Sequence, residues 1–155
     1  MKTKSTTVPE WQKNADARVA EIVADCKTIP WFKGTDVAQA KLSLEAHFEL
    51  LKPFGLKAGF EIEIVSDWAA AWDASRAAAW DAAWDAAWAA ARAAARDAAR
   101  AAAWDAAWEV VADKMPQKNP FHALWAVWKL GFWPIGVVNG KFIIFSENAA
   151  QESKP

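Results

Sequence analysis

Residues 68–108 constrain the fold more than any other part of this 155-residue chain. Every fourth position in this stretch is Trp or Arg, and nearly all the others are Ala or Asp. Ala has the highest helix propensity, and no Gly or Pro interrupts the chain from Ser66 to Met115. The sequence therefore predicts one very long helix over about residues 67–113, which would measure ~70 Å at ~1.5 Å per residue.

The large side chains of the repeat follow a stripe that winds around the predicted helix. A step of four residues advances by about 400°, so the stripe shifts by about 40° at each step. The change from Trp to Arg comes where the stripe has rotated to another side, which favours a helix buried on an aromatic face and hydrated on an Arg face. The large residues are, in order, Trp68, Trp72, Arg76, Trp80, Trp84, Trp88, Arg92, Arg96, Arg100, Trp104 and Trp108.

The Trp residues of the repeat are predicted to form an interface, because aromatic residues at helical spacing usually pack. Seven Trp on one helix are more than the remaining, N-terminal part of the chain (the head, residues 1–66) can cover, and in water they would form a large apolar patch. We therefore expect a homo-oligomer, most simply a dimer, or a protein partner. The predicted interface residues are Trp68, Trp72, Trp80, Trp84, Trp88, Trp104 and Trp108.

An alternative function is the sequestration of a small ligand or nucleotide in pockets that Trp and Arg would form between subunits. The ligand-binding residues would then be Arg92, Arg96 and Arg100. A nucleic-acid platform is not expected, because the stretch from Asp67 to Asp113 holds eight acidic residues against four Arg, and phosphate binding needs the opposite sign. The same acidic balance disfavours a helix lying on a membrane surface.

Composition excludes several other classes of protein. The net charge is −1, and the single cysteine, Cys26, permits no intramolecular disulfide. We find no secretory signal and no apolar run long enough to span a membrane, which favours a cytoplasmic location, in the host cytoplasm if a phage encodes the chain. Nucleotide-loop, nucleophile-elbow and zinc-protease motifs are absent from the sequence, so we expect no catalysis, no cofactor and no metal.

Three elements are predicted before the repeat. Helices are expected over about residues 9–27 and 36–51, and the alternation of apolar and acidic residues over 60–65 is typical of a half-buried strand. Trp31 and Phe32 lie in the turn between the helices. They are interpreted as covering the core from a loop, with an exposed anchor for a partner as the alternative.

Four polar or reactive side chains in this head are given structural interpretations. Cys26 completes the apolar face of the first helix and is expected to be a small buried hydrophobe. His47 lies among acidic residues and lacks further metal ligands at helical spacing, so we expect it to be solvated on the helix surface. Glu61 and Glu63 share the outer face of the strand and are expected to be hydrated.

The C-terminal part predicts a short helix over about residues 120–130 and a β-hairpin over 133–145. Asn139 and Gly140 supply the two positive φ angles of a type I′ turn. This turn would pair Val137 with Phe142 and Ile135 with Ile144, while Pro and Gly in the first strand indicate an edge or a bulge.

The expected fold class is α+β: a small antiparallel sheet of strand 60–65 and hairpin 133–145, short helices covering one face, and the very long helix between its strands. One domain, 1–155, would comprise a head (1–66), the repeat helix (67–113) and a helix plus hairpin (119–146). An unbroken helix separates its two ends widely. The hairpin would then lie at its far end, or on the head of a second copy in a swapped dimer.

The tetrad run and the ending NPFHALWAVWKLGFWPIGVVNGKFIIF resemble small uncharacterised bacteriophage and bacterial proteins with Ala-rich repeats of Trp, Asp and Arg. The resemblance covers roughly the last ninety residues. It implies a phage accessory protein without defined catalytic residues. Together with the Trp stripe, it favours a non-catalytic interaction or assembly protein.

Overall fold

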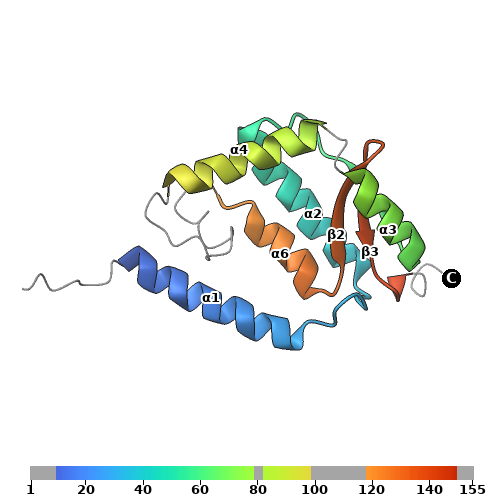
Figure 1. Ribbon diagram of the computed structural model, residues 1–155, viewed down its shortest axis with the longest axis horizontal. Coiled ribbons are helices and arrows are strands. Elements are labelled where there is room, and N and C mark those ends of the chain that lie inside the picture. Colours follow the sequence, from blue (N-terminus) through green and yellow to red (C-terminus); the bar gives the residue numbers. More distant parts are fainter. Residues whose placement is uncertain (1–9, 79–81, 99–117, 150–155) are drawn as a thin grey trace, which may run out of the picture.

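The computed structural model describes residues 10–78, 82–98 and 118–149 (Figure 1). Side chains are described throughout these ranges except at residues 10–12, 15, 82 and 95–98. Its elements, in chain order, are α1 (Glu10–Thr28), α2 (Val37–Leu51), the 3-10 helix η1 (Lys52–Phe54), β1 (Glu61–Val65), α3 (Trp68–Ala77), α4 (Ala82–Ala98), α6 (Phe121–Lys129), β2 (Trp133–Val138) and β3 (Lys141–Phe145). The α+β class is confirmed.

The three strands form one mixed sheet in the order β1-β3-β2, so the predicted antiparallel sheet is wrong. β2 and β3 pair antiparallel as a hairpin, but β1 runs parallel to β3. The reason lies in β3, whose residues Phe142–Phe145 are all buried. A continuous apolar run suits a central strand covered on both faces, and the long helical connection from β1 permits parallel pairing.

The turn of the hairpin confirms the type I′ prediction, since φ is 52° at Asn139 and 78° at Gly140. Val137 pairs with Phe142 as expected. Ile144, however, pairs with Pro134, because the register shifts between Pro134 and Gly136. The predicted pair of Ile135 with Ile144 is therefore wrong, and the predicted bulge is confirmed.

The two faces of the sheet are covered by different helices. On one face, Phe142 and Ile144 join the main core with α2, α4 and α6. On the other face, Phe145 packs against Trp68 of α3, with ring centroids 4.4 Å apart. The main core comprises Ala40, Leu44, Phe48, Leu51, Leu56, Ala87, Ala91, Phe121, Val127, Phe132, Val137, Phe142, Ile144 and Ala149.

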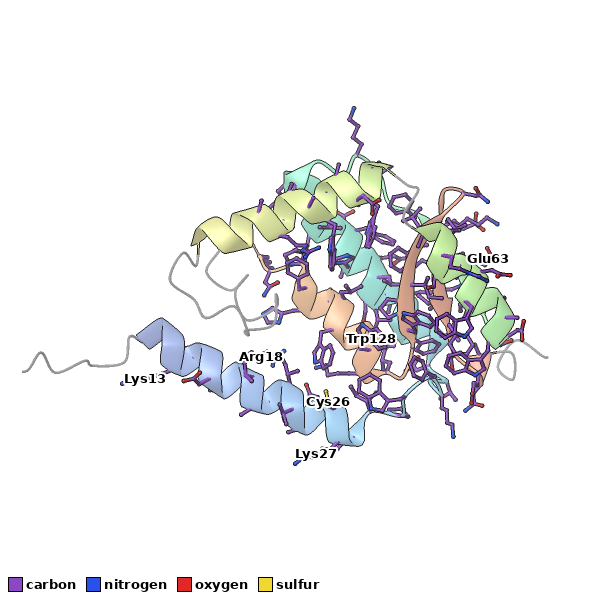
Figure 2. All side chains as sticks on the ribbon, in the orientation of Figure 1. Lys13, Arg18, Cys26, Lys27, Glu63 and Trp128 are labelled. Carbon is purple, nitrogen blue, oxygen red and sulfur yellow. The ribbon has the colours of Figure 1, made fainter. Side chains whose placement is uncertain are left out.

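Helix α1 does not cover the sheet, contrary to the prediction for residues 9–27. It lies outside α6 (Figure 1). The two helices are joined by a hydrogen bond in which the indole N–H of Trp125 in α6 donates to the carboxylate of Asp25 in α1 at 3.2 Å. Arg18 and Cys26 are on the side of α1 that faces α6, and Cys26 is only half-buried (Figure 2). Val23, an apolar residue three positions before Cys26 in α1, is 53% exposed.

The described part of the repeat forms two helices rather than one, so the single very long helix is wrong. α3 and α4 run in different directions (Figure 1), and each packs on a different face of the sheet. A straight helix cannot follow both faces of a small sheet, so burying aromatic residues on each face requires a change of direction. The end of α3 approaches the bulge closely: a Cβ on Gly136 would lie 2.9 Å from that of Ala78.

β1 of the head pairs with β3 of the hairpin within one chain. The hairpin therefore lies neither at the far end of a long helix nor on the head of a swapped second copy. Residues 99–113 of the predicted helix lie outside the described residues. Among the helices that are described, none combines the length and apolarity needed to cross a membrane.

Candidate functional site

Aromatic rings from several segments form one connected surface, which we call the aromatic surface. Phe32 lies at its centre, with its ring 5.1 Å from Trp68 and 6.1 Å from Trp133. Trp72 extends it along α3, where its ring meets Trp133 at 6.1 Å in an edge-to-face arrangement. The members of the aromatic surface are Trp31, Phe32, Trp68, Trp72, Trp128, Trp133 and Phe145.

The loop that carries Phe32 is held by hydrogen bonds from the two residues that follow β3. Phe32 has φ 63°, a conformation that costs energy for a residue with a Cβ. Its carbonyl accepts a 2.8 Å hydrogen bond from the backbone of Glu147, and the buried Ser146 hydroxyl donates to Gly34 at 2.6 Å. These bonds hold the Phe32 ring against α3.

Three indoles of the aromatic surface are exposed to solvent. Trp72 is 57% exposed, Trp31 38% and Trp68 37%. The other large exposed hydrophobic residues of the described chain, Val23 and Leu42, lie on α1 and α2. The turn aromatics thus divide: Phe32 is half-buried as the core interpretation expects, and Trp31 is exposed as the anchor interpretation expects.

Two polar contacts border the exposed indoles. The Trp68 indole N–H donates to Glu147 Oε1 at 2.7 Å, which places a carboxylate beside that ring. One turn beyond Trp72, Arg76 forms an ion pair with Asp73 at 2.8 Å, and both side chains are three-quarters exposed. The exposed side of α3 therefore carries the cation of Arg76 and the carboxylate of Asp73, and the carboxylate of Glu147 reaches it from a segment distant in the sequence.

Trp84 and Trp88 of α4 are half-buried and pack against the main core. Their rings stack with centroids 5.3 Å apart at 25°. Trp84 meets the ring of Phe142, and Trp88 meets that of Phe121 at 4.7 Å. Ala87 is buried beside them, and its small side chain lets α4 approach the core closely. These two predicted interface residues thus have partners within the chain.

The remaining predicted site residues are placed as follows. Arg92 is half-buried on α4, one turn after Trp88. Trp80, Trp104, Trp108 and Arg100 lie outside the described residues, and Arg96 lies in α4 with a side chain that is not described. A pocket built from Trp and Arg stays a prediction.

His47 is fully buried, so its predicted solvation is wrong. Its Nδ1–H donates to the carbonyl of Pro120 at 2.8 Å, and its ring meets Trp88 edge to face at 5.7 Å. Burial lowers its pKa to about 4, and the bond to Pro120 opposes that shift. The signal was available, because His47 falls three residues after the buried Leu44 and four before the buried Leu51, on the apolar stripe of α2.

The other polar candidates resemble surface groups. Glu61 and Glu63 are exposed on β1, as expected. Within the described ranges, no group of three or more His, Cys, Asp or Glu side chains is arranged to hold a metal ion.

No protein-family model, curated protein or solved structure matches this chain. The resemblance to bacteriophage and bacterial proteins, and the cytoplasmic location, therefore stay predictions.

Proposed function

We propose that this chain is a non-catalytic interaction protein that contacts its partner through the exposed part of the aromatic surface. The observation that carries the proposal is the exposure of Trp72, Trp68 and Trp31 on one connected cluster. Exposed aromatic anchors of this kind dominate the binding energy of protein interfaces. The interface thus takes only part of the Trp stripe, while Trp84 and Trp88 stabilise the core.

The energy available at this surface is sufficient for a specific contact. An indole buries roughly 150–250 Å² when covered, so covering the exposed 57% of Trp72 is worth roughly 2–4 kcal/mol at about 25 cal/mol per Å². Trp31 and Trp68 add smaller amounts because each is already more than half covered. The ring contacts within the cluster also hold the indoles in place, which lowers the entropy lost on binding.

Photo-cross-linking inside cells tests the proposal directly. A photoreactive phenylalanine derivative replaces Trp72 in the full chain, and the matched control carries the same group at Leu42, which is 58% exposed on α2. We expect a discrete protein adduct from position 72 and none from position 42. Failure to obtain any adduct from position 72, or equal adducts from both positions, would contradict the proposed function.

A further inference from the structure

We propose that the exposed side of α3 pairs with α3 of a second copy of this chain, antiparallel about a two-fold axis near Trp72. This inference rests on the proposed function and names its partner. The interface consists of Trp68 and Trp72, which are the part of the aromatic surface on α3, together with the neighbouring charged residues Arg76 and Glu147.

The outward side of α3 is chemically distinct from its inward side. Ala71 is fully buried toward the sheet. Ala69, Trp72, Asp73 and Arg76 are exposed. Trp72 and Arg76 are one helical turn apart and therefore lie on the same side, next to the small Ala69. This side presents one large apolar group, one cation and a small residue that permits close helix approach.

The pattern is complementary to itself. When two copies of α3 run antiparallel about Trp72, the residue one turn before Trp72 on one helix faces the residue one turn after it on the other. Trp68 of one copy then faces Arg76 of the second copy. Trp68 holds the Glu147 carboxylate at 2.7 Å, so the guanidinium meets an indole and a carboxylate together. Because the dimer is two-fold symmetric, this contact forms twice, once at each end of the paired helices.

Arg76 can change partners at little cost. Its ion pair with Asp73 spans three residues of one helix, and both side chains are three-quarters exposed, a setting in which ion pairs contribute little to stability. The ten residues of α3 measure only ~15 Å, so the paired helices bury less than the ~1,200 Å² of a standard stable interface. The dimer should therefore be a weak one, formed at micromolar concentrations or above.

Sedimentation equilibrium on the full chain, from micromolar to millimolar concentration, tests the pairing. Arg76→Glu places a carboxylate against Glu147 of the second copy and should weaken dimerisation by at least about tenfold. Glu147→Arg alone should do the same, and the double variant should recover most of the affinity. Lys52→Glu is the matched control, because Lys52 forms the same kind of exposed ion pair, with Glu49, away from α3. The control should dimerise like the wild type.

A wild type that stays monomeric throughout this range overturns the pairing, as does a dimer that Arg76→Glu leaves unchanged. Thermal melts check that each variant is folded. Should Arg76→Glu unfold the protein, Arg76→Gln replaces it with the same expected direction of change. The adduct at position 72 separates this proposal from the proposed function. An adduct of two copies supports both, an adduct with another protein alone overturns only the pairing, and no adduct overturns both.

Discussion

Protonation of His47 should destabilise the fold at acidic pH. The imidazole of His47 in α2 is fully buried, and its Nδ1–H donates a hydrogen bond to the carbonyl of Pro120. A buried imidazolium would lose its hydration and face the edge of Trp88 rather than a counter-ion. The folded protein therefore binds the second proton weakly, with a pKa of about 4 against 6.5 for the free side chain.

The size and direction of the effect follow from this difference. Between pH 6.5 and 4 the unfolded chain binds a proton at His47 that the folded chain does not, so the free energy of unfolding falls as the pH is lowered through this window. Above pH 6.5 both states are neutral, and below pH 4 both are charged. Two and a half pKa units, at about 1.36 kcal/mol each, give a loss of roughly 3 kcal/mol.

Urea unfolding at pH 7, 6, 5 and 4 measures this loss. Carboxylates also begin to titrate near the lower end, so the informative quantity is the difference between the wild type and His47→Gln, which removes only this imidazole. The wild type should lose roughly 3 kcal/mol more than the variant between pH 7 and pH 4. Parallel pH profiles for the two proteins, or an NMR titration that gives the His47 imidazole of the folded wild type a pKa near 6.5, would refute the reasoning.

The repeat and the packing around β3 give three further predictions. Trp84→Ala should lower the free energy of unfolding by about 3–5 kcal/mol because it empties a packed core site, whereas Trp72→Ala should cost under about 1 kcal/mol; equal losses in urea unfolding would contradict this division. Gly34→Ala should lower the melting temperature strongly, since a Cβ would lie 2.6 Å from the Phe132 ring. Ser146→Ala should cost about 1–3 kcal/mol, because the carbonyl of Gly34 loses its buried donor, and a melt unchanged from the wild type would argue against that bond.

Local elements were predictable because their signals act within a few residues. The Asn139–Gly140 turn positioned the hairpin, and alternation of apolar and acidic residues identified β1. The predicted helix over 36–51 agrees with α2, whose first turn is capped by the Asp36 carboxylate. Sequence could not settle the strand order, because the same hairpin can add to β1 through either of its strands. β3 became central because its apolar residues needed cover on both faces.

The candidate site was predictable only in part. The repeat predicted Trp68 and Trp72 as interface residues, whereas Trp31 was interpreted as covering the core, with an exposed anchor as the alternative. Sequence could not show that these three belong to one cluster, since the contacts through Phe32 join segments far apart in the chain.

By itself, the sequence determined that the described repeat is helical and that its Trp residues recur at one spacing, because Ala propensity and helical geometry are properties of the local chain. Only the tertiary structure decided which of the described Trp residues of the repeat are half-buried against the core and which are exposed. Successive Trp tetrads are chemically alike, so nothing local distinguishes Trp72 from Trp84. The difference arises because α3 and α4 meet opposite faces of the sheet. The larger core half-buries Trp84, whereas the smaller cluster around α3 and the Phe32 ring leaves Trp72 57% exposed.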